Sequence, residues 1–205
     1  MLVLTVDQRR SRGSADQVER LLGWLEERRL PTVRRFERTA GDEVQGVLDS
    51  PPAAVGLVLD LVRQDRWSIG LGVGPVDEPL PTSTRAGSGP AFVLARDAVT
   101  RAKSRPTGLA VSGPALAAAG HAQTALDLAA ALVQRRSERG WEAVDLAASG
   151  LSQVEVAKRL DISKQAVSQR LQAADWHLEG PARQLASHLV AVADASGAGG
   201  RLGAR

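Results

Sequence analysis

The chain has 205 residues, enough for one large domain or for two small domains with ordinary cores. It contains no cysteine, which excludes a disulfide framework and a thiolate metal site and makes a reducing cytoplasm the expected compartment. Lys and Arg number 26 against 23 Asp and Glu, and this balance permits nucleic-acid binding without requiring it. The first apolar run ends at Asp7 and no later run approaches a membrane span, so we expect no signal peptide and no membrane segment.

The first half of the chain alternates between short apolar runs and helical patterns. The opening run L-V-L-T-V-D predicts a buried strand that ends at Asp7, and Ser14 opens a capping box at the start of a helix. Gly41 followed by Asp42 is a tight-turn pairing and predicts a hairpin. The expected elements are a strand over 2–7, a helix over 14–29, strands over 32–40 and 43–49, a helix over 51–62, a strand over 67–74, a helix over 90–103 and a strand over 108–112.

The strand expected over 67–74 has one large and one small face. Its small face carries only Ser68, Gly70, Gly72 and Gly74. Such a face indicates that another group approaches the backbone closely. A packed helix, a second subunit or a nucleotide base could fill it.

This element order predicts an α+β class, in which an N-terminal ferredoxin-like domain of βαββαβ plus αβ is followed by an all-α domain. In a ferredoxin-like sheet with strand order 4-1-3-2, the first and third strands are adjacent and antiparallel. Asp7 is then expected beside Asp42 and Glu43. Carboxylates gathered in this way suit Mg²⁺ or Mn²⁺, which would hold the phosphates of a nucleotide. The alternative is a hairpin turn with solvated acids.

A basic, hydroxyl-rich loop follows Asp7. Together with the start of the next helix it could bind phosphates, although such a loop can equally be a solvated surface. The candidate phosphate-binding residues are Arg9, Arg10, Ser11, Arg12 and Ser14.

Four motifs in this half resemble the palm domain of class III nucleotide cyclases and GGDEF proteins, and most closely the bacterial SatD-like family. They are V-D, G-D-E, S-I-G-L-G-V-G and G-P-A-F-V-L-A-R, in that order. The resemblance implies binding of a purine nucleotide with Mg²⁺. Ala40 stands where GGDEF proteins have glycine and Phe92 where cyclases have a transition-state asparagine, although Arg96 matches their following arginine. We therefore predict a non-catalytic domain and assign no catalytic residue.

Beyond Pro114 the composition changes to Ala, Leu and Gln, which predicts an all-helical second half. A long helix is expected to end before Gly140, and a short helix is expected to close at Gly150. The predicted organisation is a palm-like domain at 1–112, a connecting helix at 113–139, a helix-turn-helix domain at 140–195 and a disordered tail at 196–205.

The run from Gly150 to Trp176 predicts two short helices joined by a tight turn. Ser152 and Glu155 form a capping box, and Ser163 caps the second helix. Residues expected in a shared core are Val156, Ala157, Leu160, Ile162, Val167 and Leu171.

The opposite face of the second helix carries side chains that read base edges and phosphates. The segment resembles the helix-turn-helix of many bacterial regulators and of sigma-factor region 4, through the form S-x-x-x-V-S-x-x-L. The alternative is a helical pair that serves only for packing. The candidate DNA-binding residues are Ser163, Lys164, Gln165, Ser168, Gln169 and Gln172.

The segment 141–180 carries more acids than bases, so one copy is expected to bind double-stranded DNA weakly and a homodimer is expected. The sequence therefore favours a cytoplasmic DNA-binding transcriptional regulator whose palm-like domain senses a nucleotide or mediates dimerisation. The alternative is an active, Mg²⁺-dependent nucleotide cyclase with an accessory helical domain. A scaffold that binds neither ligand is a third possibility.

Overall fold

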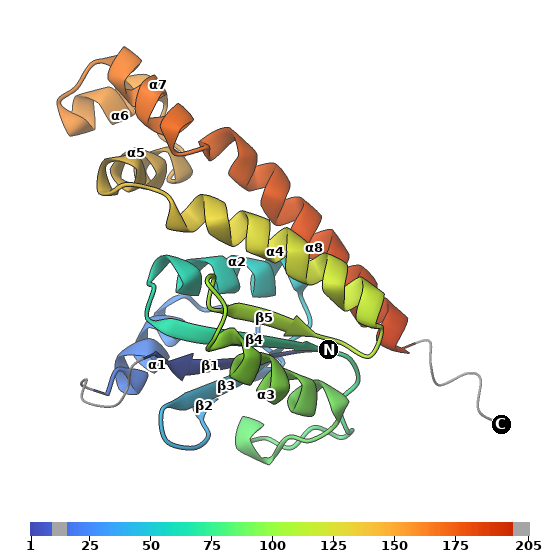
Figure 1. The fold of residues 1–205 in the computed structure, drawn as a ribbon. Helices are drawn as coiled ribbons and strands as arrows, with labels where there is room; N and C mark the ends of the chain where they lie inside the picture. The colour runs from blue at the N-terminus through green and yellow to red at the C-terminus, as the bar shows by residue number, and fades with distance from the viewer. Residues whose placement is uncertain (10–15, 199–205) are drawn as a thin grey trace.

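The computed structural model describes residues 1–9 and 16–198 (Figure 1). The chain belongs to the α+β class, with a five-stranded mixed sheet. The first part contains β1 (Leu2–Gln8), α1 (Val18–Glu27), β2 (Arg34–Arg38), β3 (Glu43–Leu48), α2 (Pro51–Arg63), β4 (Trp67–Val73), the 3₁₀ turn η1 (Thr84–Ala86), α3 (Pro90–Ala102) and β5 (Leu109–Ser112). The second part contains α4 (Leu116–Gln134), α5 (Glu138–Ala148), α6 (Gln153–Leu160), α7 (Lys164–Ala173) and α8 (Trp176–Ala198).

The strand order is β2-β3-β1-β4-β5. β1 is antiparallel to both β3 and β4, whereas β5 is parallel to β4. The prediction that the first and third strands are adjacent and antiparallel is confirmed, with Asp7 directly opposite Glu43.

Several predicted helix boundaries differ from the structure. The first helix begins at Val18, and Gln17 is its N-cap without a side-chain cap, while Ser14 lies outside the described residues. The long helix stops at Gln134, because Ser137 caps a new helix and accepts a hydrogen bond from the Gly140 amide. Gly140 therefore lies inside α5 and does not end a helix.

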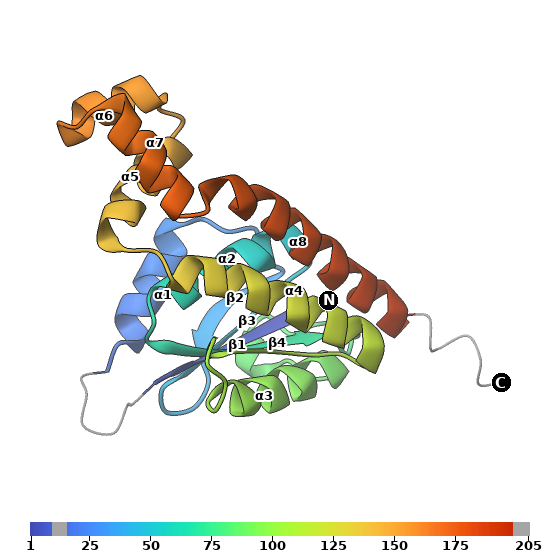
Figure 2. The ribbon, with the colours of Figure 1, turned by 45° about the horizontal axis from the view of Figure 1, so that its top comes forward.

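Successive side chains of β1 point to opposite faces of the sheet, and each face has its own hydrophobic core. Leu2, Leu4 and Val6 of β1 belong to the larger core, which includes residues of α1, α2, α4 and α8. Val3 belongs to a smaller core with residues of α3. Figures 1 and 2 show α3 on one side of the sheet and α2 on the other. Asp7 has the parity of Val3, so its side chain lies on the α3 side.

The small face of β4 is filled by α3. A Cβ atom on Gly70 would overlap the Val99 backbone nitrogen, and one on Gly72 would overlap the Ala91 carbonyl oxygen. Of the three ways to fill this face, the packed helix is the one observed, and it leaves no room there for a nucleotide base.

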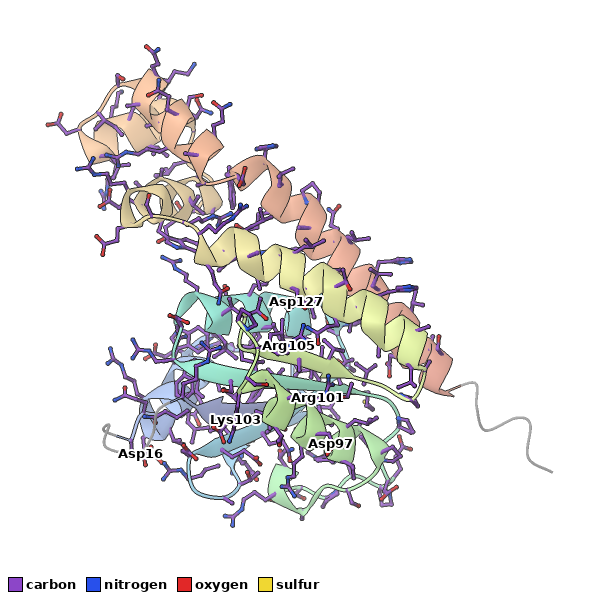
Figure 3. The ribbon with its side chains drawn as sticks, in the orientation of Figure 1. Asp16, Asp97, Arg101, Lys103, Arg105 and Asp127 are labelled. Carbon is purple, nitrogen blue, oxygen red and sulfur yellow. The ribbon has the colours of Figure 1, made fainter. Side chains whose placement is uncertain are left out.

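The open edge of β5 is satisfied by side chains from two helices. Arg101 of α3 donates to the Val111 carbonyl oxygen, and Gln123 of α4 accepts from the Val111 amide at 2.7 Å. Asp127 of α4 forms an ion pair with Arg105 (Figure 3). These contacts hold α4 beside the sheet and block the pairing of a further strand at Val111.

α4 and α8 lie side by side on the α2 side of the sheet and carry α5, α6 and α7 at one end (Figures 1 and 2). Ala186, Val190 and Ala193 of α8 are fully buried in the larger core. α8 lies largely in the segment 140–195 that was predicted to be the helix-turn-helix domain, yet it packs on the first part of the chain. It continues to Ala198 because this packing extends the helix, so 196–198 are not a tail, and the remainder of the predicted tail lies outside the described residues.

By length and composition, α4 could cross a membrane, with a mean hydropathy of 1.2. This helix therefore meets the criterion of length and composition that no run was expected to meet, and the absence of a membrane segment stays a prediction. One face of α4 is buried against α2, β5 and α8, whereas Leu116 and Leu128 are exposed.

A buried polar junction joins the helical module to the rest. Arg136, just after α4, donates from Nε to the Ala174 carbonyl oxygen at 2.8 Å and forms an ion pair with Glu179 of α8. Its guanidinium also lies 4.7 Å from the centre of the Trp141 ring. Arg63 of α2 also stacks on that ring, at 3.7 Å, and forms two hydrogen bonds of 2.7 Å with Asp145 of α5. The junction thus fixes α5 against both α2 and α8.

We predict that Gly70→Ala destabilises the protein by about 1–3 kcal/mol, because the added methyl group overlaps the α3 backbone. Urea unfolding followed by circular dichroism measures the change. Gly120→Ala is the matched control: Gly120 lies in α4, and a Cβ added there would meet no neighbouring side chain or other element within 4 Å, so alanine should stabilise the helix by about 0.5–1 kcal/mol. Equal effects of the two substitutions would contradict the close approach of α3.

Candidate functional site

The two capped helices predicted between Gly150 and Trp176 are α6 and α7. Ser152 accepts a hydrogen bond from the Glu155 amide, and Glu155 accepts one from the Ser152 amide at 2.8 Å. The capping box is confirmed, and hydrogen bonds from Ser152 lower the pKa of Glu155. Ser163 caps α7 by accepting from the Ala166 amide at 3.1 Å.

The turn between the helices depends on Asp161. This residue has φ of 52° and ψ of 48°, the left-handed conformation that ends a helix abruptly. The Ile162 amide then donates to the Ala157 carbonyl oxygen at 3.0 Å. The chain therefore changes direction between the end of α6 at Leu160 and the start of α7 at Lys164, which lets the two short helices pack across each other.

The core under the two helices is the predicted one with additions from α5. Val156 and Val167 are fully buried, and Leu171 is nearly so. Ala143 and Val144 of α5 complete the core, a contribution that the sequence pattern did not assign. α5 is therefore a structural support for α6 and α7.

The predicted polar face of α7 is exposed. Its five side chains make no hydrogen bond and no ion pair within the described residues, so they are available to a partner. They are Lys164, Gln165, Ser168, Gln169 and Gln172. Ser163, the sixth candidate, is exposed and occupied with capping.

The structure changes the charge balance expected for this module. Four of the six acids in 141–180 form ion pairs, three of them with arginines outside that segment. The pairs are Glu142 with Arg170, Asp145 with Arg63, Asp175 with Arg135, and Glu179 with Arg136 and Arg183. The field near α7 is therefore less negative than the segment count suggests.

Two basic residues next to α7 were not predicted as part of the site. Lys158 and Arg159 occupy the last turn of α6, are exposed and form no ion pair in the described part of the chain. With Lys164 they make three exposed cations on the two-helix unit. The sequence feature that could have identified them is the pair of adjacent basic residues, Lys158 and Arg159, just before the turn.

The second candidate site is a carboxylate cluster on the α3 side of the sheet. Asp7 and Glu43 are cross-strand neighbours, and their side chains are 14% and 15% exposed. Asp42 lies next to Glu43 in the hairpin turn and raises the pKa of Asp7 by its charge. The predicted pairing of Asp7 with Glu43 is thus observed, and Asp42 is close enough to act on Asp7 by its charge.

Cations from α3 and its C-terminal end accompany both buried carboxylates. Lys103 Nζ lies 2.8 Å from Asp7 Oδ2, and Arg96 lies 3.6 Å from Glu43. Thr39 also donates to Glu43 at 2.6 Å. In the sequence, Arg96 was singled out only through the family resemblance, and Lys103 was not assigned, because it lies 96 residues from Asp7 along the chain.

Burial raises the pKa of Asp7 above its ordinary value of 3.8, and the charges of Asp42 and Glu43 act in the same direction. Lys103 opposes these effects by hydrogen bonding and by its charge, but the net shift is upward. The ionised form of Asp7 is therefore less favourable in the folded protein than in the unfolded chain.

The described residues contain no group of three or more His, Cys, Asp or Glu side chains placed to hold a metal ion. Asp7 and Glu43 are already paired with Lys103 and Arg96, so a divalent ion would have to displace these cations. The arrangement does not fit a resident metal, and only a ligand that competes with Lys103 could bring one.

The predicted phosphate-binding loop is described only at its first residue. Arg9 forms an ion pair with Asp65 at 3.1 Å, and its guanidinium covers Gly108. Its charge therefore lies beside the residues that precede β4 and β5 and is paired there with Asp65. Arg10, Ser11, Arg12 and Ser14 lie outside the described residues.

No family model, no curated protein and no solved structure matches this chain. Any functional assignment therefore depends on the residues themselves.

We predict that Asp7→Asn stabilises the protein at neutral pH, because it removes a carboxylate that folding disfavours in its ionised form. The pKa of Asp7 is higher in the folded protein than in the unfolded chain. The gain in stability from Asp7→Asn should therefore be complete at a pH above the pKa of the folded protein. It should disappear at a pH below the pKa of the unfolded chain, where Asp7 is protonated in both states. Thermal melting across this pH range measures it.

Asp49→Asn is the control, since Asp49 is exposed and should show little change at any pH. A lower melting temperature for Asp7→Asn at neutral pH would mean that the bond to Lys103 outweighs burial.

Proposed function

We propose that the chain is a DNA-binding transcriptional regulator in which α6 and α7 form a helix-turn-helix and α7 enters the major groove. The observation that carries the proposal is the exposed face of α7, on which three glutamines and Lys164 have no partner within the described residues. Glutamine pairs with adenine through two hydrogen bonds, and a lysine near a helix N-terminus suits a phosphate.

The turn and the caps support this assignment. A recognition helix presents its N-terminal residues to the bases while the preceding helix lies across the backbone. Lys158 and Arg159, at the end of α6, are placed for such backbone contacts. Arginines of neighbouring elements pair with acids of the segment 141–180 and reduce its negative charge. The electrostatic repulsion between this segment and DNA is therefore smaller.

For the first part of the chain we propose a ferredoxin-like, palm-like domain that is not a cyclase. The strand order β2-β3-β1-β4 and the antiparallel pairing support it. Phe92, at the position where cyclases carry asparagine, is buried in the core with Val3 and Val47, so it presents no polar group to a substrate. We place the protein in the cytoplasm on its lack of cysteine.

A second candidate function is the sensing of a purine nucleotide with Mg²⁺ at Asp7, Asp42 and Glu43. The position of Asp42 and Glu43 beside Asp7 supports it, because a cation bound there would relieve the mutual repulsion of the acids. Lys103 and Arg96 act against it as built-in competitors. The alternative of an active cyclase has no supporting observation of this kind.

We predict that Gln165→Ala with Gln169→Ala reduces binding to a selected double-stranded fragment by about tenfold or more, since each bidentate base contact contributes about 1–3 kcal/mol. Binding to random DNA should be unchanged. Lys164→Ala should instead weaken all sequences and lower the salt slope by about one. Fluorescence anisotropy at several salt concentrations measures both effects.

Gln134→Ala, in an exposed glutamine at the end of α4, is the matched control and should bind like the parent protein. If the double glutamine variant retains full discrimination between the selected and random fragments, α7 is not the reading helix.

We predict that a purine nucleotide with Mg²⁺ raises the melting temperature of the parent protein but not of Asp42→Ala. Lys103→Met should enlarge the rise, because it removes the competitor from Asp7. Differential scanning fluorimetry measures the shifts, and no cyclic product should accumulate. No shift in either the parent or Lys103→Met would reject nucleotide sensing, whereas a cyclic product would favour the enzyme.

A further inference from the structure

The last helix has an unusual distribution of charge. From Trp176 to Ser196, α8 contains three charged residues, Glu179, Arg183 and Asp194, and none of them is exposed. Each is held by an ion pair on the inner side: Glu179 by Arg136, Arg183 by Asp60, and Asp194 by the amino group of Met1. The helix thus directs all of these charges toward its own protein.

The outer side of α8 is apolar at regular intervals. Leu178, Leu185 and Val192 are 43%, 53% and 40% exposed. They are seven residues apart, so they lie on one line about 21 Å long on the helix surface. The exposed residues around them are histidine, glutamine, serine, glycine, alanine and proline, with no lysine, arginine, aspartate or glutamate.

A solvated helix face normally carries charged residues, and a face without them is typical of the centre of a protein interface. The seven-residue spacing is that of helices that pack against other helices. We propose that the outer face of α8, formed by Leu178, Leu185 and Val192, is the surface on which a second copy of this chain packs. This proposal rests on the proposed function, for which the sequence predicts a homodimer.

The chemistry of the face favours a second copy over other partners. In a symmetric dimer the same patch meets itself, so an uncharged patch buries no unpaired charge. DNA or an acidic partner would find no cation here, and a membrane-surface helix would need basic residues beside its apolar line, which the exposed side of α8 lacks from Trp176 to Ser196.

The position of α8 gives such a dimer a role in DNA binding. α7 ends at Ala173 and α8 begins at Trp176, so the helix that pairs is joined to the reading helix by two residues. Pairing through α8 fixes the two copies of α7 relative to each other. DNA with two half-sites would then be bound by both at once, which increases affinity without further contacts in either copy.

Sedimentation equilibrium of the full chain without DNA tests the interface. The parent protein should be a dimer at micromolar concentration, and Leu185→Lys should be a monomer, because two buried ammonium groups would face each other near the axis. Val93→Lys is the matched control: Val93 is 62% exposed on α3, on the opposite side of the sheet, and this variant should remain a dimer. Circular dichroism of both variants should match that of the parent, because both side chains are exposed in the single chain. The melting temperature of Val93→Lys should be unchanged, whereas that of Leu185→Lys should fall because the stabilisation from dimerisation is lost.

Cysteine cross-linking provides a second measurement, because the chain has no cysteine of its own. Single cysteines at Leu178, Leu185 and Val192 should form disulfide-linked dimers, alone or in mixed pairs, under mild oxidation, and a cysteine at Val93 should not. A monomeric parent, a dimeric Leu185→Lys, or the absence of cross-links at all three positions would overturn the proposal.

Failure of this interface can be distinguished from failure of DNA binding. Sedimentation and cross-linking test the interface without DNA. The effect of replacing Gln165 and Gln169 on base discrimination tests DNA binding, and it can be measured whether the parent protein is a dimer or a monomer. If the interface is correct, Leu185→Lys should retain binding to a single half-site and lose at least tenfold in affinity for a paired site. Equal affinity of the parent and Leu185→Lys for the paired site would also overturn it.

Discussion

The orientation of the two-helix unit depends on one buried ion pair. Arg136 and Glu179 have side chains only 1% and 9% exposed, and their terminal atoms that face each other have no hydrogen-bond partner in the described part of the chain, so charge pairing compensates their desolvation. The same arginine bonds to the carbonyl oxygen of Ala174 at the end of α7 and approaches the Trp141 ring. One side chain therefore contacts α5, the end of α7 and α8. Together with the contacts of Arg63 of α2 to α5, this side chain connects the two-helix unit to the first part of the chain.

The close approach of α3 to β4 determines which cations lie beside the carboxylate cluster of Asp7 and Glu43. Because Gly70 and Gly72 let the helix backbone reach the sheet, Lys103 and Arg96 arrive beside Asp7 and Glu43. The acids and the glycines share one face, so the packing that completes the fold also neutralises the candidate site. Any cation bound at the cluster would have to replace these two ion pairs.

The sequence predicted features that depend on neighbouring residues. The capping box at Ser152, the cap at Ser163 and the burial of Val167 follow from local hydrogen bonding and helical periodicity, and the structure contains all three. The gathering of Asp7 with Glu43 followed from strand order. Lys103 was missed because no local pattern connects the end of α3 to β1. The return of α8 to the first core was missed because alanines are compatible with either face of a helix.

The return of α8 also determines the order in which the protein can fold during synthesis. Its buried Ala186, Val190 and Ala193 belong to the same core as β1, although they are among the last residues to leave the ribosome. α5, α6 and α7 emerge earlier and have a separate small core. The two-helix unit can therefore form on a nascent chain whose sheet domain is still incomplete. A chain that ends after α7 would carry a folded α6 and α7 beside a first core that lacks Ala186, Val190 and Ala193, and the apolar residues left exposed would make it prone to aggregation.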